Sequence, residues 1–103
     1  MIVTPVFLRS VVWVNNFNFT YNKSSIFVLC VEHDQEVEYI LELDGVSEFR
    51  FVESIKEEDP VFEVIESLSE ENENGAMLRF ISGTHLLQVR FTKCSIHPTS
   101  IDS

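Results

Sequence analysis

The densest group of side chains that could do chemistry spans residues 32–36, with the sequence Glu-His-Asp-Gln-Glu. It is the only place in the sequence where a histidine stands among carboxylates, and both groups are ligands of divalent metals. The segment has neither EF-hand spacing nor a His-Glu-x-x-His pattern. Because these residue types are usually exposed, we interpret the segment as a solvated turn between two strands.

Two runs of carboxylates could bind calcium through oxygen. The first run consists of Glu57, Glu58 and Asp59, and the second consists of Glu70, Glu71 and Glu73. A calcium site needs several carboxylates that converge in space, whereas adjacent residues of an extended chain point apart. The runs are therefore interpreted as solvated loops. Neither a metal nor another cofactor is predicted.

The sequence pairs no nucleophile with a base. His85 lies near a glycine-containing turn and His97 precedes a proline, and neither is placed by sequence beside a cysteine or a serine. The glycines are isolated, so no phosphate-binding loop is predicted. An enzyme is not expected, since its site would have to be visible only in three dimensions.

The two cysteines, Cys30 and Cys94, each lie in an apolar, strand-like segment. A disulfide needs neighbouring strands with suitable Cβ geometry, and free, buried thiols are the favoured interpretation. Residues 1–14 lack the pattern of a secretory signal, and no apolar run approaches the roughly 18 residues of a membrane span. A cytoplasmic location is therefore expected.

The acidic residues are distributed unevenly. Of 17 in total, 16 lie in residues 32–73, where Arg50 and Lys56 are the only basic residues. The rest of the sequence holds Asp102 and the basic residues Arg9, Lys23, Arg79, Arg90 and Lys93. With a net charge of −10 at pH 7, the chain attracts basic partners and repels nucleic acid and anionic lipid. Neither nucleic acid nor a membrane is expected as a partner.

The composition predicts a single folded domain over residues 1–103. Hydrophobic residues make up 45% of the chain, which is too apolar for a disordered acidic tail. Short apolar runs rich in Val, Ile, Phe, Thr and Tyr alternate with turn residues, as is typical of strands. The predicted fold class is mainly β, an antiparallel meander of about eight strands that forms a sandwich or a barrel.

Three strands are predicted in the first third of the chain. Residues 2–8 are expected to form an edge strand, because their proline lacks the N–H that a central strand needs. The aromatic residues of 17–21 alternate with polar ones, so one aromatic, buried face is expected there. After a turn at residues 22–25, the uninterrupted apolar run 26–31 is interpreted as the central strand, covered on both faces.

A hairpin is predicted with a three-residue loop at residues 43–45. In that register Tyr39 lies beside Phe49, and Glu38 forms a cross-strand ion pair with Arg50. A two-residue Asp-Gly loop would instead set apolar residues opposite charged ones, so it is rejected.

Residues 60–68 admit two interpretations. A proline after an aspartate, and the spacing of the apolar residues, favour a short helix. The β-branched residues and a partial alternation favour a strand, which we prefer. A turn at residues 72–75 is then expected, and after it a strand in which Leu87, Val89 and Phe91 face inward.

The function predicted from these features is that of a non-enzymatic binding protein whose acidic surface inhibits or neutralises a basic partner. Carboxylates can occupy the groove where a nuclease toxin or a nucleic-acid-binding enzyme holds phosphates, and electrostatic attraction speeds such capture. The residues predicted to contact the partner are Glu57, Glu58, Asp59, Glu66, Glu70, Glu71 and Glu73.

In layout, the chain resembles small acidic bacterial immunity-type proteins and phage-encoded inhibitors, which are compact single domains without a catalytic signature. The segments that carry this resemblance are residues 41–46, which lead into 49–51, and the strand region 86–96. The resemblance implies a toxin or a host enzyme as the partner.

The alternative is a structural or assembly subunit of a homo-oligomer with no inhibitory role, whose charge only maintains solubility. Its copies would join through exposed strand edges or through the aromatic N-terminal region. The binding hypothesis requires that the carboxylates gather into one contiguous patch when the chain folds. Carboxylates that are scattered, or interleaved with the outlying cations, would count against it.

Overall fold

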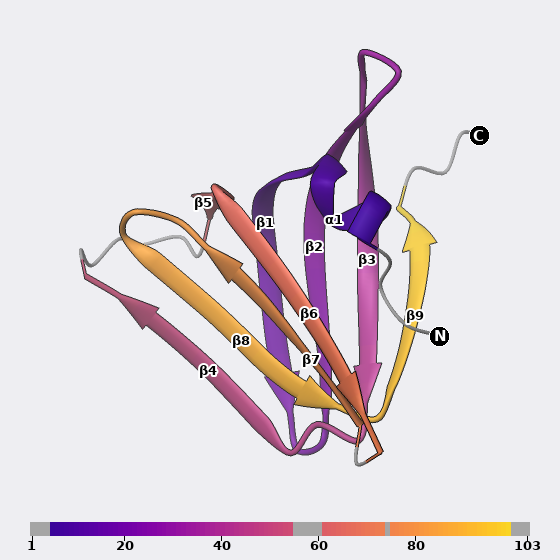
Figure 1. Ribbon diagram of the computed structural model, residues 1–103, viewed down its shortest axis with the longest axis vertical. Coiled ribbons are helices and arrows are strands. Elements are labelled where there is room, and N and C mark those ends of the chain that lie inside the picture. The colour runs from indigo at the N-terminus through magenta and orange to yellow at the C-terminus, as the bar shows by residue number, and fades with distance from the viewer. Residues whose placement is uncertain (1–4, 55–60, 74, 100–103) are drawn as a thin grey trace.

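The computed structural model describes residues 5–54, 61–73 and 75–99, which form a short helix and two antiparallel β-sheets. In chain order the elements are α1 (Pro5–Ser10), β1 (Val11–Thr20), β2 (Lys23–Glu32), β3 (Gln35–Asp44), β4 (Glu48–Glu53), β5 (Phe62–Glu63), β6 (Glu66–Asn72), β7 (Gly75–Ile81), β8 (His85–Phe91) and β9 (Lys93–Pro98). Figure 1 shows one sheet lying across the other, with the β2–β3 hairpin extending beyond both.

The two sheets form a sandwich, and the prediction of a mainly β fold is confirmed. The five-stranded sheet has the order β5-β1-β2-β3-β9, and the four-stranded sheet has the order β4-β8-β7-β6. No ladder joins the two sheets among the described strands, so they do not close into a barrel. The described residues contain no helix long and apolar enough to cross a membrane.

The core lies between the sheets because alternate side chains of each strand point inward. On β2, Ile26, Val28 and Cys30 are fully buried, and on β8 Leu87, Val89 and Phe91 are buried as predicted. Phe80 of β7 is the largest fully buried side chain. The outward residues of β2, among them Phe27 and Leu29, stay partly exposed, so the prediction that this central strand is covered on both faces is wrong.

The edge strand predicted for residues 2–8 is also wrong, since helix α1 begins at Pro5, and residues 1–4 lie outside the described residues. A proline at the first position of a helix loses no hydrogen bond, because the N–H there has no partner within the helix. Leu8 packs into the core, and the Ser67 hydroxyl donates to the Leu8 carbonyl at 3.2 Å. The helix therefore lies against β6.

The aromatic segment 17–21 is only partly buried. Phe17 packs against the core, whereas Phe19 is 45% exposed and stacks on Phe49 with ring centroids 4.9 Å apart. Tyr21 is 89% exposed and lies in the β1–β2 turn with a φ of 56°. The turn therefore comes before residue 23, earlier than the predicted 22–25, because Thr20 already pairs with Lys23.

The hairpin predicted around residues 43–45 does not form. Strand β3 pairs with β2 on one edge and β9 on the other, while β4 pairs with β8 in the other sheet. Both edges of β3 are therefore occupied. Gly45, with a φ of +66° and the Thr92 side chain against it, carries the chain from one sheet to the other. Glu38 consequently does not meet Arg50, which lies opposite Gln88.

The described part of residues 60–68 contains no helix but two strands, β5 in the five-stranded sheet and the start of β6 in the four-stranded sheet. The preference for a strand over a short helix is therefore confirmed there, although not as one strand, and residue 60 lies outside the described residues. Strand β6 turns back into β7 through the predicted turn at residues 72–75, where Asn72 pairs with Gly75. Because β6 pairs with β7 alone, it forms an edge of the four-stranded sheet.

Candidate functional site

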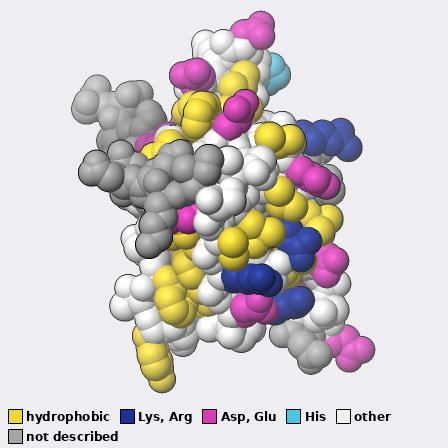
Figure 2. Space-filling model, turned by 90° about the vertical axis from the view of Figure 1, so that its left-hand side faces the viewer, with side chains coloured by type: hydrophobic (Ala, Val, Ile, Leu, Met, Phe, Trp, Pro, Cys, Tyr) yellow, Lys and Arg dark blue, Asp and Glu magenta, His cyan; other side chains and the backbone are white. Residues whose placement is uncertain are grey.

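On the five-stranded sheet, carboxylates lie next to cations and hydrogen-bond donors. Asp44 is 3.7 Å from the Lys23 ammonium, and Glu42 is 3.3 Å from His97. Glu38 accepts a hydrogen bond from the Asn15 amide at 2.8 Å. Figure 2 shows Lys and Arg side chains between Asp and Glu side chains on another face of the molecule. The described acids of residues 32–73 therefore do not form the one contiguous patch that the binding hypothesis requires.

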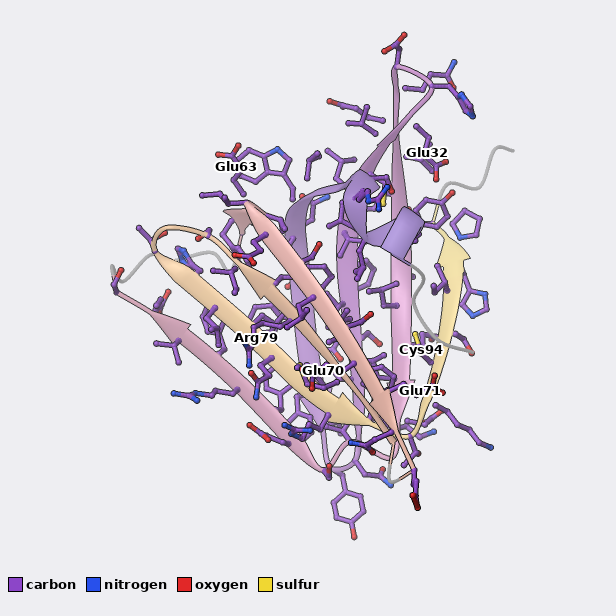
Figure 3. The ribbon with its side chains drawn as sticks, in the orientation of Figure 1. Glu32, Glu63, Glu70, Glu71, Arg79 and Cys94 are labelled. Carbon is purple, nitrogen blue, oxygen red and sulfur yellow. The ribbon has the colours of Figure 1, made fainter. Side chains whose placement is uncertain are left out.

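A narrower acidic feature runs along β5, β6 and the turn that follows. Five exposed carboxylates there make no hydrogen bond or ion pair with any described residue, and they are Glu63, Glu66, Glu70, Glu71 and Glu73. We call these five residues the acidic strip. Residues 61–73 contain no lysine, arginine or histidine. In Figure 3, Glu63 lies near the start of β6, while Glu70 and Glu71 lie toward its end.

The strip follows from the alternation of an edge strand. Ser67 and Ser69 turn toward the interior and are half-buried, whereas Glu66, Leu68 and Glu70 are exposed on the outer face. Glu66 and Glu70 are four residues apart on this face, or about 13 Å along the strand. Charged side chains on an edge strand also prevent its pairing with the sheets of other molecules, which is a structural role in itself.

The structure brings together part of the predicted partner-binding set. Glu66, Glu70, Glu71 and Glu73 lie in the acidic strip, while Glu57, Glu58 and Asp59 lie outside the described residues. The prediction missed Glu63. This residue is a single carboxylate in an apolar segment of the sequence, and only the pairing of β5 with β1 fixes its place.

The histidine-containing segment 32–36 forms the tip of the β2–β3 hairpin, as predicted. His33 and Asp34 form its turn with φ values of 51° and 64°, and both side chains are exposed. Glu32 accepts a hydrogen bond from the Tyr39 hydroxyl at 3.1 Å. The part of the chain that the structure describes holds no group of three or more His, Cys, Asp or Glu residues that could bind a metal.

His85, which the sequence places near a glycine-containing turn, is one of three buried polar residues in the described part of the chain. Its side chain is 2% exposed, and its ring is parallel to that of Phe62 with centroids 5.1 Å apart. The Thr84 hydroxyl lies 2.6 Å from Nδ1. The Glu53 carboxylate lies 3.7 Å from Nε2, which has no hydrogen-bond partner among the described residues.

The residues around His85 line a cavity of about 340 Å³ at one end of the sandwich, next to Trp13, Phe62 and Ile65. The order of groups here is that of a nucleophile, a base and an orienting group, namely the Thr84 hydroxyl, the His85 imidazole and the Glu53 carboxylate. The distance between Glu53 and Nε2 is nevertheless too long for a hydrogen bond, and Nε2 is buried. Stacking and the Thr84 contact hold the ring as part of the packing, and we assign it no catalytic role.

Both cysteines are free and buried, as predicted. Cys30 pairs with Val37 and Cys94 with Leu43, so they lie toward opposite ends of β3, about 20 Å apart and too far for a disulfide. Burial raises the pKa of the Cys94 thiol to about 11, and burial is also the main cause that raises the pKa of Cys30. Neither thiol is a reactive thiolate at neutral pH.

Comparison with known proteins gives no match for this chain, whether with protein-family models, with curated proteins or with solved structures. The function is therefore argued from the side chains and their placement.

Proposed function

We propose that the protein is a non-enzymatic binding protein that uses the acidic strip to hold and neutralise a basic protein partner, such as a nuclease toxin or a nucleic-acid-binding enzyme. The observation that carries this proposal is the row of five exposed carboxylates, none of which has a partner among the described residues. Lysine and arginine side chains of a partner would supply the missing donors as charge-assisted hydrogen bonds.

The position of the strip on an edge strand favours a protein partner over a small cation. Glu66 and Glu70 lie on the outer face, whereas Glu71 turns to the other side, so the carboxylates spread along the strand and do not converge on one point. A row of cations on a partner surface, or a basic extended segment that adds to the sheet edge, matches this spacing.

The proposal is tested with two variants of equal charge. Glu70→Lys with Glu73→Lys changes the strip, and Glu36→Lys with Glu42→Lys makes the same change in net charge at exposed sites on the other sheet. The probe is a labelled deca-arginine peptide, mixed by stopped flow at low ionic strength. We expect the strip variant to reduce the association rate constant about tenfold and the control variant to reduce it by less than about twofold.

Equal slowing by both variants would mean that only net charge matters, and it would refute the proposal. Unfolding curves of both variants check that the fold is retained, since substitutions at exposed positions are expected to change stability by no more than about 0.5 kcal/mol.

Assembly into a homo-oligomer remains a second candidate function because a separate observation favours it. The outer face of the four-stranded sheet carries arginines and apolar side chains beside two residues of the acidic strip.

A further inference from the structure

The cavity of about 340 Å³ at the end of the sandwich adjoins one residue of the acidic strip. Its lining includes Glu63 together with the apolar side chains of Trp13, Phe62 and Ile65. Trp13 is 39% exposed and Ile65 is 71% exposed, so two large apolar side chains of the lining are open to solvent. Figure 3 shows Glu63 toward the upper end of the molecule, whereas Glu70 lies toward the lower end of β6. The cavity therefore combines exposed apolar surface with a carboxylate of the strip.

The register of β1 and β5 sets Trp13 directly opposite Glu63. Residues that are opposite each other on antiparallel strands share a face, with Cβ atoms about 4.5–5.5 Å apart. The next pair, Val14 with Phe62, is buried in the core, so Trp13 and Glu63 point to the outer side of the sheet. Because β5 forms the edge of its sheet, residues of both its faces line the cavity. An indole and a carboxylate thus lie side by side at this cavity.

The polar groups that the β7–β8 turn contributes to the lining are already engaged. The Ser82 hydroxyl accepts hydrogen bonds from the amides of Thr84 and His85 at 3.1 and 2.9 Å. The Thr84 hydroxyl lies against His85 Nδ1. His85 Nε2 has no hydrogen-bond partner among the described residues, but it is buried, and the carboxylate near it is that of Glu53. The Glu63 carboxylate, in contrast, is exposed and makes no contact with a described cation or donor.

This combination fits a cation on an apolar stem, and it fits arginine better than lysine. A planar guanidinium stacks on an indole and forms two parallel hydrogen bonds with a carboxylate, whereas an ammonium is a more strongly hydrated point charge. The methylene groups of arginine can lie on apolar side chains such as Ile65. None of the described residues that line the cavity is a lysine or an arginine, so the chain supplies no such cation there itself.

We propose that the cavity binds an arginine side chain of the basic partner, with the guanidinium stacked on Trp13 and hydrogen-bonded to Glu63. This inference rests on the proposed function, because it names the partner residue that binds at one end of the acidic strip. Arginine and tryptophan are enriched among the residues that contribute most to protein interfaces. A volume of about 340 Å³ lies at the small end of the range for ligand sites, which suits a single side chain.

Fluorescence titration with small amides tests the proposal. The probes are Nα-acetylarginine amide and Nα-acetylcitrulline amide, because citrulline has the shape of arginine but carries a neutral urea. Trp13 is the only tryptophan of the chain, so its emission reports on the cavity directly. We expect the arginine amide to change this emission saturably, with a dissociation constant of about 1–10 mM. At equal ionic strength, the citrulline amide should bind about tenfold more weakly and Nα-acetyllysine amide about threefold more weakly.

Glu63→Gln and Glu70→Gln form a matched pair of variants. They make the same change in net charge at exposed residues of the acidic strip, but Glu70 does not line the cavity. We expect Glu63→Gln to bind the arginine amide about fivefold more weakly than the native protein, and Glu70→Gln to bind it within about twofold of the native value. Equal weakening by the two variants, unchanged binding by Glu63→Gln, or equal binding of the arginine and citrulline amides would overturn the proposal.

Failure of this proposal and failure of the proposed function give different results. If the cavity does not select arginine, the stopped-flow comparison with the variant of Glu70 and Glu73 still decides the role of the strip, because neither residue lines the cavity. If that comparison fails while Glu63→Gln weakens binding of the arginine amide as expected, the acidic strip is refuted and the cavity stands as an arginine site.

Discussion

Replacing Phe80 by alanine is expected to lower the free energy of unfolding by about 3–5 kcal/mol, because the change removes a buried ring and leaves a cavity. Phe80 is 0% exposed and lies on the inner face of β7, between β6 and β8. Domains of this kind have total stabilities of about 5–15 kcal/mol, so the loss is a large share of the whole. Because β7 holds β6 in the sheet, the variant should also loosen the acidic strip.

Phe19→Ala is the control, since it makes the same chemical change at a ring that is 45% exposed and stacked on Phe49. Its expected cost is about 1 kcal/mol. Urea unfolding followed by tryptophan fluorescence measures both values. Equal losses at the two positions would mean that the described core between the sheets is wrong.

Replacing Gly75 by alanine is expected to destabilise the protein by about 3 kcal/mol, through backbone strain and a collision. Gly75 has a φ of +138°, and a Cβ atom there would lie 2.6 Å from the Phe91 carbonyl oxygen. This oxygen belongs to the backbone of β8 and cannot move aside cheaply. Since Gly75 opens β7 at the end of the turn that sets the register of β6, the substitution acts directly on the strand that carries the acidic strip.

Gly83→Ala is the matched substitution for this test. A Cβ atom at Gly83 would have no described atom within 4 Å, and this glycine has no positive φ, so the expected change is no more than about 0.5 kcal/mol. Thermal unfolding of the two variants side by side measures the difference. A Gly75→Ala protein as stable as Gly83→Ala would contradict the strained turn between β6 and β7.

The features that could be predicted from the sequence are those that depend on neighbouring residues. Alternation on the last strands placed Leu87 and Val89 in the core, and turn residues marked the 72–75 hairpin, because both signals are local. The pairing of β3 with β9 could not be predicted, since their residues are far apart in the sequence. The Asp-Gly pair is a local signal, and it suggested a hairpin between β3 and β4. That hairpin cannot form because β9 occupies the edge of β3 that β4 would need.

In the candidate site, too, only the features that depend on neighbouring residues could be predicted from the sequence. The acidic runs of the sequence identified most of the strip, but its separation from the paired carboxylates of the other sheet depends on long-range contacts such as Lys23 with Asp44. The burial of His85 arises from its stacking on Phe62, a residue of another strand and the other sheet. The grouping of Arg50 with Arg79 depends on a register across three strands, which no sequence pattern reveals.

The central claim, that basic partners bind along β5 and β6, is tested most directly by NMR. Isotope-labelled protein is titrated with the deca-arginine peptide, and the shift of each backbone amide is followed. The account predicts that the largest shifts fall on residues 61–73, and that residues 32–44 at the paired carboxylates change little. Shifts of equal size at the two segments would contradict it, because binding would then follow net charge and not the acidic strip.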